Sequence, residues 1–212
     1  MGKSIYAIPY TALNLEAASI KGELMSAFEN VLDSGRYILG PELAAFEGEF
    51  AAYCGTRFAT GVANGTGALH LVMRGLELKN GDEIITTSNS FIASASTIAL
   101  AGARPVFADI RSDGNIDPEK IEAAITPRTR VIIPVHLTGR PARMPEILEI
   151  AARKGLFVLE DAAQAVGAAL DGKRVGGWGD AACFSLHPLK NLHAYGDGGM
   201  VTTNRKDTCD YI

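Results

Sequence analysis

Leu156-Phe157-Val158-Leu159-Glu160-Asp161-Ala162-Ala163-Gln164 is the stretch of this chain that decides the fold. Its first four residues form an apolar run without polar alternation, which predicts a strand buried on both faces of a sheet. Gly155 stands just before this run and ends the helical pattern of residues 144–154. A buried strand directly after a helix is typical of α/β folds, in which helices cover both faces of a mainly parallel sheet.

The same alternation of strand and helix continues on both sides of this stretch. The predicted strands cover residues 58–63, 83–86, 105–107, 131–135, 156–159 and 181–184, and the predicted helices cover residues 42–53, 69–76, 91–101, 117–125 and 144–154. We therefore expect an α/β fold with a mainly parallel sheet and helices on both faces. In such folds, ligands bind at the carboxyl ends of the strands.

Composition narrows the possible functions. The 212 residues carry a formal net charge of −4 and 47% hydrophobic residues, a composition that argues against a nucleic-acid binder and favours small-molecule chemistry. The three cysteines are far apart and lack a CxxC spacing, so we expect neither a disulfide framework nor a metal site. Residues 1–10 contain no signal-peptide core and no stretch reaches membrane-spanning length, so we expect a cytoplasmic protein without membrane contact.

Asn64-Gly65-Thr66-Gly67-Ala68 lies between a predicted strand and a predicted helix. Free backbone N–H groups and the positive end of the helix dipole can bind a phosphate there. The motif has neither the spacing of a nucleotide P-loop nor that of a dinucleotide site, so a simple tight turn is an equal alternative.

Asp161 follows the buried strand, where its carboxylate stays ionised only if a cation faces it. The pyridinium nitrogen of pyridoxal phosphate is such a cation, and a helix-capping role is the alternative. Lys190 stands in Ser185-Leu186-His187-Pro188-Leu189-Lys190-Asn191, after a predicted strand, where desolvation can lower the pKa of its amine enough for imine formation. Phe91 could stack on a planar ring or belong to the core.

Several motifs together carry a specific resemblance. They are Asn-Gly-Thr at 64–66, Ser-Phe at 90–91, Pro-Val-His-Leu at 134–137, Glu-Asp-Ala-Ala-Gln at 160–164 and Ser-Leu-His-Pro-Leu-Lys-Asn at 185–191, with further matches at 35–41 and 196–199. In this order they resemble the sugar aminotransferases of the DegT/DnrJ/EryC1/StrS family over nearly the whole chain. The resemblance implies the large domain of an aspartate-aminotransferase-like fold (pyridoxal-phosphate fold type I). It also implies a homodimer with shared active sites, and transfer of an amino group from glutamate or glutamine to a nucleotide-linked keto-hexose.

The resemblance also implies individual roles. Lys190 would form the Schiff base with pyridoxal 5'-phosphate, and Asp161 would pair with the pyridinium nitrogen. Gln164 would contact the ring hydroxyl and Phe91 would stack on the ring. The phosphate would be bound by residues Thr66, Gly67 and Ser185.

The chain departs from the commoner family pattern at Leu186, His193, Thr138 and Arg140, which bears on the substrate subgroup rather than on the cofactor. The roles of His187 and His193 stay open. Residues 1–212 correspond to the large domain with its N-terminal segment, and we expect the small C-terminal domain of the family to lie outside this chain.

Other functions are compatible with parts of this pattern. A keto-cyclitol is an alternative acceptor, and a chain of this length could bind pyridoxal phosphate without turnover. A pyridoxamine-dependent sugar dehydratase of the same family is disfavoured by Lys190, because a histidine replaces the lysine in those relatives. A nicotinamide-dependent oxidoreductase is disfavoured because no GxGxxG follows the first strand.

Overall fold

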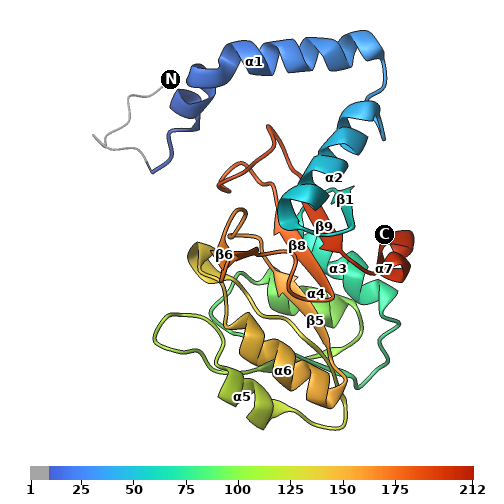
Figure 1. Cartoon of the computed structure of the whole chain (residues 1–212), viewed down its shortest axis with the longest axis vertical. Helices are drawn as coiled ribbons and strands as arrows, with labels where there is room; N and C mark the ends of the chain where they lie inside the picture. The colour runs from blue at the N-terminus through green and yellow to red at the C-terminus, as the bar shows by residue number, and fades with distance from the viewer. Residues whose placement is uncertain (1–9) are drawn as a thin grey trace. The chain divides into compact units, whose positions relative to one another are not determined.

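A computed structural model describes residues 10–212, and the chain divides into two compact units, Met1–Ala45 and Phe46–Ile212 (Figure 1). Residues 1–9, which make up most of the segment searched for a signal peptide, lie outside the described residues. Among residues 10–212, no helix combines the length and apolar character needed to cross a membrane.

The first unit consists mainly of one long helix. Helix α1 (Leu13–Ser34) ends at Gly35, whose φ of 63° is the left-handed conformation that glycine adopts readily at a helix end. None of its residues is buried. Helix α2 (Pro41–Cys54) begins in this unit and ends in the next, in agreement with the helix predicted over 42–53.

A seven-stranded sheet forms the centre of the second unit. Its order is β1-β9-β8-β5-β4-β2-β3. The strands are β1 (Phe58–Val62), β2 (Glu83–Thr86), β3 (Arg104–Phe107), β4 (Thr129–Ile132), β5 (Phe157–Asp161), β8 (Ala181–Ser185) and β9 (Gly199–Thr203). Strand β9 is antiparallel to both neighbours, and the other pairs are parallel. The predicted mainly parallel sheet is confirmed.

Helices cover both faces of this sheet (Figure 1). The helices of the second unit are α3 (Gly65–Gly75), α4 (Ala93–Leu100), α5 (Pro118–Ala124), α6 (Met144–Lys154) and α7 (Lys206–Tyr211). One core joins α3 and α4 to residues such as Leu159 and Cys183, and a second joins α5 and α6 to Val158 and Ile132. Consecutive strand residues therefore pack against helices on opposite sides, as the pleat of a strand requires.

Strand boundaries differ from the predictions at two places that matter for the site. The strand predicted over 131–135 ends at Ile132, because Pro134 has no N–H to donate and Val135 makes only an isolated bridge with Asp161. The strand predicted over 156–159 instead covers Phe157–Asp161, so Asp161 is its last residue.

The remaining elements are short. Strands β6 (Ala169–Leu170) and β7 (Lys173–Arg174) form a hairpin, and a 3-10 turn, η1, covers Leu137–Gly139.

Candidate active site

A cavity of about 650 Å³ lies at the carboxyl ends of the parallel strands of the second unit. Its lining includes Asn64, Thr66, Ser90, Phe91, Asp161, Gln164, Ser185, His187 and Lys190. The chain thus brings together residues from the ends of β1, β2, β5 and β8, which are far apart in the sequence. Six of the seven predicted site residues line this cavity, and Gly67 is not among the lining residues.

Asp161 contributes a buried carboxylate to the cavity. Its Oδ2 accepts a hydrogen bond from Ser94 Oγ at 2.7 Å, and its Oδ1 accepts one from the Ala163 N–H at 3.2 Å. Burial raises the pKa of Asp161 above its ordinary value, and these hydrogen bonds offset the effect only in part. No helix starts at this residue, so the helix-capping alternative does not apply. A cation beside this carboxylate would stabilise its ionised form.

The turn that precedes α3 faces the end of β8. Asn64 Oδ1 caps the helix by accepting the Gly67 N–H at 2.8 Å, so this N–H already has a partner within the protein. The N–H groups of Gly65 and Thr66 occupy the first two helical positions, where no carbonyl precedes them within the helix. An anion at this end of the cavity would meet those N–H groups and the positive end of the helix dipole.

Two glycines allow the close approach that shapes this end of the cavity. A Cβ on Gly65 would lie 2.8 Å from Ser185 Cβ, and a Cβ on Gly199 would lie 2.5 Å from the Asn64 carbonyl carbon. Real side chains do not reach such distances, so both positions need glycine. The hydroxyl of Ser185 and the N-terminus of α3 therefore lie on the same side of the cavity.

Lys190 enters the cavity from the loop after β8. The Lys190 N–H donates to the His187 carbonyl at 2.8 Å, which closes a tight turn, and His187 Nδ1 accepts the Leu189 N–H at 3.2 Å. The side chain of Lys190 is half-buried, and its charge is one of the weaker influences that lower the pKa of Asp161. Asp161 at the end of β5 and Lys190 in the loop after β8 thus face one cavity.

Phe91 and Gln164 complete the lining. Phe91 lies just before α4 and is 68% exposed, so it is not a core residue of the described chain. Gln164 Oε1 accepts the Thr138 N–H from the η1 turn at 2.9 Å. The neighbouring His193 is half-buried, its ring packs edge-on against Tyr195 at 5.4 Å, and its Nδ1 lies 3.2 Å from the Lys190 carbonyl oxygen.

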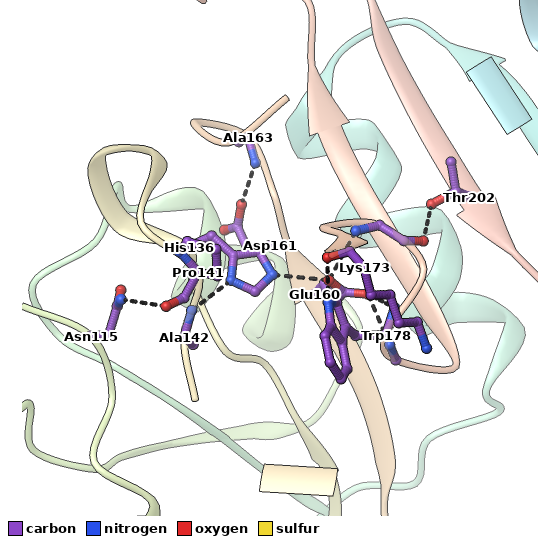
Figure 2. A network of polar contacts seen from close by, with 12 residues as sticks. Asn115, His136, Pro141, Ala142, Glu160, Asp161, Ala163, Lys173, Trp178 and Thr202 are labelled. Atoms are coloured by element: carbon purple, nitrogen blue, oxygen red, sulfur yellow. Dashed lines mark hydrogen bonds and ion pairs between the residues drawn. The ribbon is translucent and has the colours of Figure 1, made fainter. Parts of the chain in front are cut away.

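A buried polar network supports the site from the other face of the sheet, and sequence reasoning did not identify it (Figure 2). His136 and Glu160 are both fully buried. His136 Nδ1 accepts the Ala142 N–H at 3.0 Å, so the ring proton is on Nε2 and donates to Glu160 Oε2 at 3.0 Å. The same carboxylate accepts the N–H groups of Gly176, Trp178 and Gly179.

Ionisation of Glu160 is favoured by this network. Burial alone would raise the pKa of Glu160, but the hydrogen bonds from His136, Gly176 and Gly179 outweigh it and hold that pKa below its ordinary value. The only local signal in the sequence was an acidic residue inside an apolar strand, which requires hydrogen-bond partners when buried. Among residues 10–212, no cluster of three or more histidines, cysteines or acidic residues could hold a metal ion.

Comparison with known proteins identifies close relatives. Residues 18–212 match the model of the DegT/DnrJ/EryC1/StrS aminotransferase family. The chain is 48% identical over 206 residues to a dTDP-3-amino-3,4,6-trideoxy-alpha-D-glucose transaminase of Streptomyces venezuelae, covering 97% of this chain and 54% of that protein. It is 46% identical to a UDP-N-acetyl-3-dehydro-alpha-D-glucosamine 3-aminotransferase of Acidithiobacillus ferrooxidans, covering 93% of this chain and 54% of that protein.

A solved structure is similarly close. The crystal structure of DesV from S. venezuelae in complex with a ketimine intermediate matches with a TM-score of 0.92 and 47% identity, covering 96% of this chain and 55% of that one. The chain therefore has the fold of the matching part of a pyridoxal-phosphate-type aminotransferase. The chain spans about half the length of the curated relatives it matches.

Proposed function

Because this chain belongs to the DegT/DnrJ/EryC1/StrS aminotransferase family, as its match over residues 18–212 shows, we propose that the whole protein is a pyridoxal-phosphate-dependent nucleotide-sugar aminotransferase. The observation that carries the proposal is one cavity lined by both the buried Asp161 carboxylate and the Lys190 amine. Cytoplasmic location remains an expectation from the sequence alone.

The residues present fit the cofactor at both of its charged ends. Asp161 is buried, its pKa is raised, and its ionised form needs a cation, a need that a protonated pyridine nitrogen meets. At the other end, the Gly65 and Thr66 N–H groups and the Ser185 hydroxyl would form the phosphate cradle, and Gly65 permits the close approach of α3 to Ser185 because a Cβ there would lie 2.8 Å from Ser185 Cβ. A phosphate dianion suits that cradle because three donors and a helix dipole favour negative charge.

Individual roles follow from these positions. When bound, pyridoxal phosphate supplies an electron sink that stabilises negative charge on the amino-bearing carbon. Asp161 would hold the proton on the ring nitrogen, and Phe91 would cover one ring face. Lys190 Nζ would bond to the cofactor in the resting enzyme and, once displaced by the donor amine, would carry a proton to and from the reacting carbon. Gly67 would act through the Asn64 cap rather than by contact.

The remaining parts of the proposal concern the whole protein. The amino donor is glutamate or glutamine, the acceptor is a nucleotide-linked keto-hexose aminated at the 3- or 4-position, and two copies share their active sites. A small C-terminal domain completes each site. The relatives named for dTDP and UDP sugars support a nucleotide-linked acceptor without selecting the nucleotide.

Reduction with borohydride tests the central claim. The cofactor-loaded protein is reduced and digested, and the peptide that carries the pyridoxyl group is identified by mass spectrometry. We expect the label on Lys190, its loss in Lys190→Ala, and its retention in Lys154→Ala, a variant of an exposed lysine at the end of α6. A label chiefly on another lysine would overturn the assignment. A panel of keto substrates offered to the amino form then distinguishes nucleotide-linked sugars from keto-cyclitols.

A further inference from the structure

Gln164 is hydrogen-bonded in a way that fixes the orientation of its amide. Its Oε1 lies 2.9 Å from the Thr138 main-chain nitrogen. A backbone N–H can donate only to the oxygen of a side-chain amide, so the oxygen must face Thr138. The Nε2 group is therefore the amide atom left to the cavity that Gln164 lines.

Thr138 holds an unusual backbone conformation at this contact. Its φ of 54° and ψ of 25° lie in the left-handed region, which a β-branched residue seldom adopts. Strained positions of this kind persist where the surrounding structure fixes them, and they gather at functional sites. The Thr138 hydroxyl donates to the Leu137 carbonyl at 2.7 Å, which stabilises the turn locally.

The residues on either side of Thr138 are also held in place. The Leu137 N–H donates to Asn115 Oδ1 at 3.1 Å, and Asn115 is itself buried. The His136 N–H donates to the Asp161 carbonyl at 3.0 Å, and the His136 ring is fixed by Glu160 (Figure 2). The turn that contacts Gln164 is thus tied to the strand that carries Asp161.

From this geometry we infer that Thr138 is a positioning residue: its N–H fixes the Gln164 amide so that Nε2 donates a hydrogen bond into the cavity, to the ring oxygen of the cofactor. The inference rests on the proposed function, since that function supplies the ring oxygen. The contact explains why a strained threonine is tolerated at this turn. The contact also determines that Gln164 donates to the ring oxygen, and a donor stabilises negative charge on the oxygen it meets.

Two substitutions of Gln164 in the cofactor-loaded protein test whether its side chain presents a hydrogen-bond donor or an acceptor to the cavity. Gln164→Met keeps the length but removes both polar groups. Gln164→Glu keeps an oxygen for Thr138 and puts a second, negatively charged oxygen where Nε2 stands. The measurement is the pH midpoint of the visible absorption band of the bound cofactor, together with cofactor retention.

If Nε2 is the donor, both substitutions should disturb the bound cofactor, and Gln164→Glu should disturb it more than Gln164→Met. Loss of one hydrogen bond to a charged oxygen should raise the midpoint by about one pH unit in Gln164→Met. Gln164→Glu should raise it further or lower cofactor retention by about tenfold or more, because two anionic oxygens repel. A Gln164→Glu variant that matches the parent while Gln164→Met does not would show that the amide oxygen faces the cavity, and would overturn the inference. Parent-like behaviour of both variants would overturn it as well.

Substitutions of Thr138 test the positioning role itself. Thr138→Gly keeps the N–H and accepts the left-handed conformation, so the midpoint should stay at the parental value. Thr138→Pro removes the N–H and, because proline cannot adopt a φ of 54°, also breaks the η1 turn, so the midpoint should rise at least as far as in Gln164→Met. Equal midpoints in these two Thr138 variants would exclude the role of this N–H. If Thr138→Pro does not fold, hydrogen exchange at the Thr138 amide decides the positioning role, because the Gln164 pair tests only which amide atom faces the cavity.

Hydrogen exchange separates this inference from the proposed function. The Thr138 amide of the cofactor-free protein should exchange slowly in the parent and Gln164→Glu, and faster in Gln164→Met. Slow exchange without any cofactor band would mean that the contact exists and the proposed function is wrong. A parental band abolished by Lys190→Ala, combined with fast exchange at Thr138, would mean that the positioning inference alone is wrong.

Discussion

Glu160 and Asp161 are consecutive residues of β5, and their carboxylates lie on opposite faces of the sheet. Asp161 accepts a hydrogen bond from Ser94 on α4 and lines the cavity, whereas Glu160 accepts hydrogen bonds from His136 and from the Gly176, Trp178 and Gly179 N–H groups. The pleat of the strand separates them. One carboxylate is satisfied entirely by the protein, and the other keeps a raised pKa beside the cavity. Their substitutions should therefore have opposite consequences.

Asp161→Asn should impair cofactor binding and transamination while costing the cofactor-free protein little stability. The pKa of Asp161 is raised in the folded state, so its unfavourable contribution is absent well below the unfolded pKa of about 3.9 and grows as pH rises toward the folded pKa. The amide lacks this penalty, so the stability of the variant relative to the parent should improve with rising pH. Urea unfolding of both proteins across this range checks the sign. A relative stability that falls with rising pH, or turnover at the parental rate, would contradict the prediction.

Glu160→Gln should destabilise the fold by about 3 kcal/mol, the scale for breaking a buried charged network. One amide oxygen cannot accept from all four of its donors. The pKa of Glu160 is lowered in the folded state, so its stabilisation is present above the unfolded pKa of about 4.3 and is lost as pH falls through the folded pKa. The difference between parent and variant should accordingly shrink on acidification.

Glu122→Gln is the matched control for this carboxylate. Glu122 pairs with Arg153 at 3.0 Å on the surface, and both side chains are about half exposed. Its loss should cost less than about 1 kcal/mol. Similar losses in the two variants would show that the buried network of Glu160 is not what stabilises this part of the fold.

Phe91→Ala should weaken cofactor retention by about fivefold, which corresponds to about 1 kcal/mol of aromatic contact. Because Phe91 is 68% exposed, the free energy of unfolding should change little. Phe107→Ala serves as the control, since Phe107 is 53% exposed at the edge strand β3 and does not line the cavity. Dialysis of the cofactor-loaded proteins measures retention, and equal retention in both variants would remove Phe91 from the site.

Local sequence pattern predicted the elements that depend on local forces. The apolar run at 156–159 and the Gly155 stop predicted a buried strand after α6, and both are present. Strand β9 was missed, because its Thr202 and Thr203 look exposed in sequence yet donate to the Gly176 and Asp180 carbonyls. Those carbonyl partners are more than twenty residues away in the sequence, so a local sequence pattern cannot predict the hydrogen bonds that bury Thr202 and Thr203.

The residues of the site also differ in how far the sequence alone could predict them. The positions of Asp161 and Lys190 after buried strands pointed to a common site, and both line the cavity, while their chemical roles stay predictions. The functions of Glu160 and His136 were not predicted, since a fully buried pair on the far face becomes visible only once β4 and β5 are paired. The Thr138 contact required a left-handed backbone that its residue type argues against.

Gly65→Ala and Gly67→Ala, two changes in one turn, should have opposite effects. A Cβ at Gly65 would lie 2.8 Å from Ser185 Cβ, so α3 or β8 must move, which should cost about 1–3 kcal/mol of stability and open the phosphate end of the cavity. A Cβ at Gly67 would lie 3.4 Å from Asn64 Oδ1, near ordinary contact, and alanine is the better helix former by about 1 kcal/mol. We therefore expect Gly65→Ala to lose cofactor affinity by about tenfold or more, the scale of one or two lost hydrogen bonds to a charged group. Gly67→Ala should keep the affinity for the cofactor and gain a little stability.

Thermal unfolding and cofactor titration of both variants measure whether stability and affinity are lost at Gly65 and kept at Gly67. A marked loss of affinity in Gly67→Ala would mean that Gly67 contacts the phosphate directly, as the family resemblance implied, and that the Asn64 cap opens when the cofactor binds.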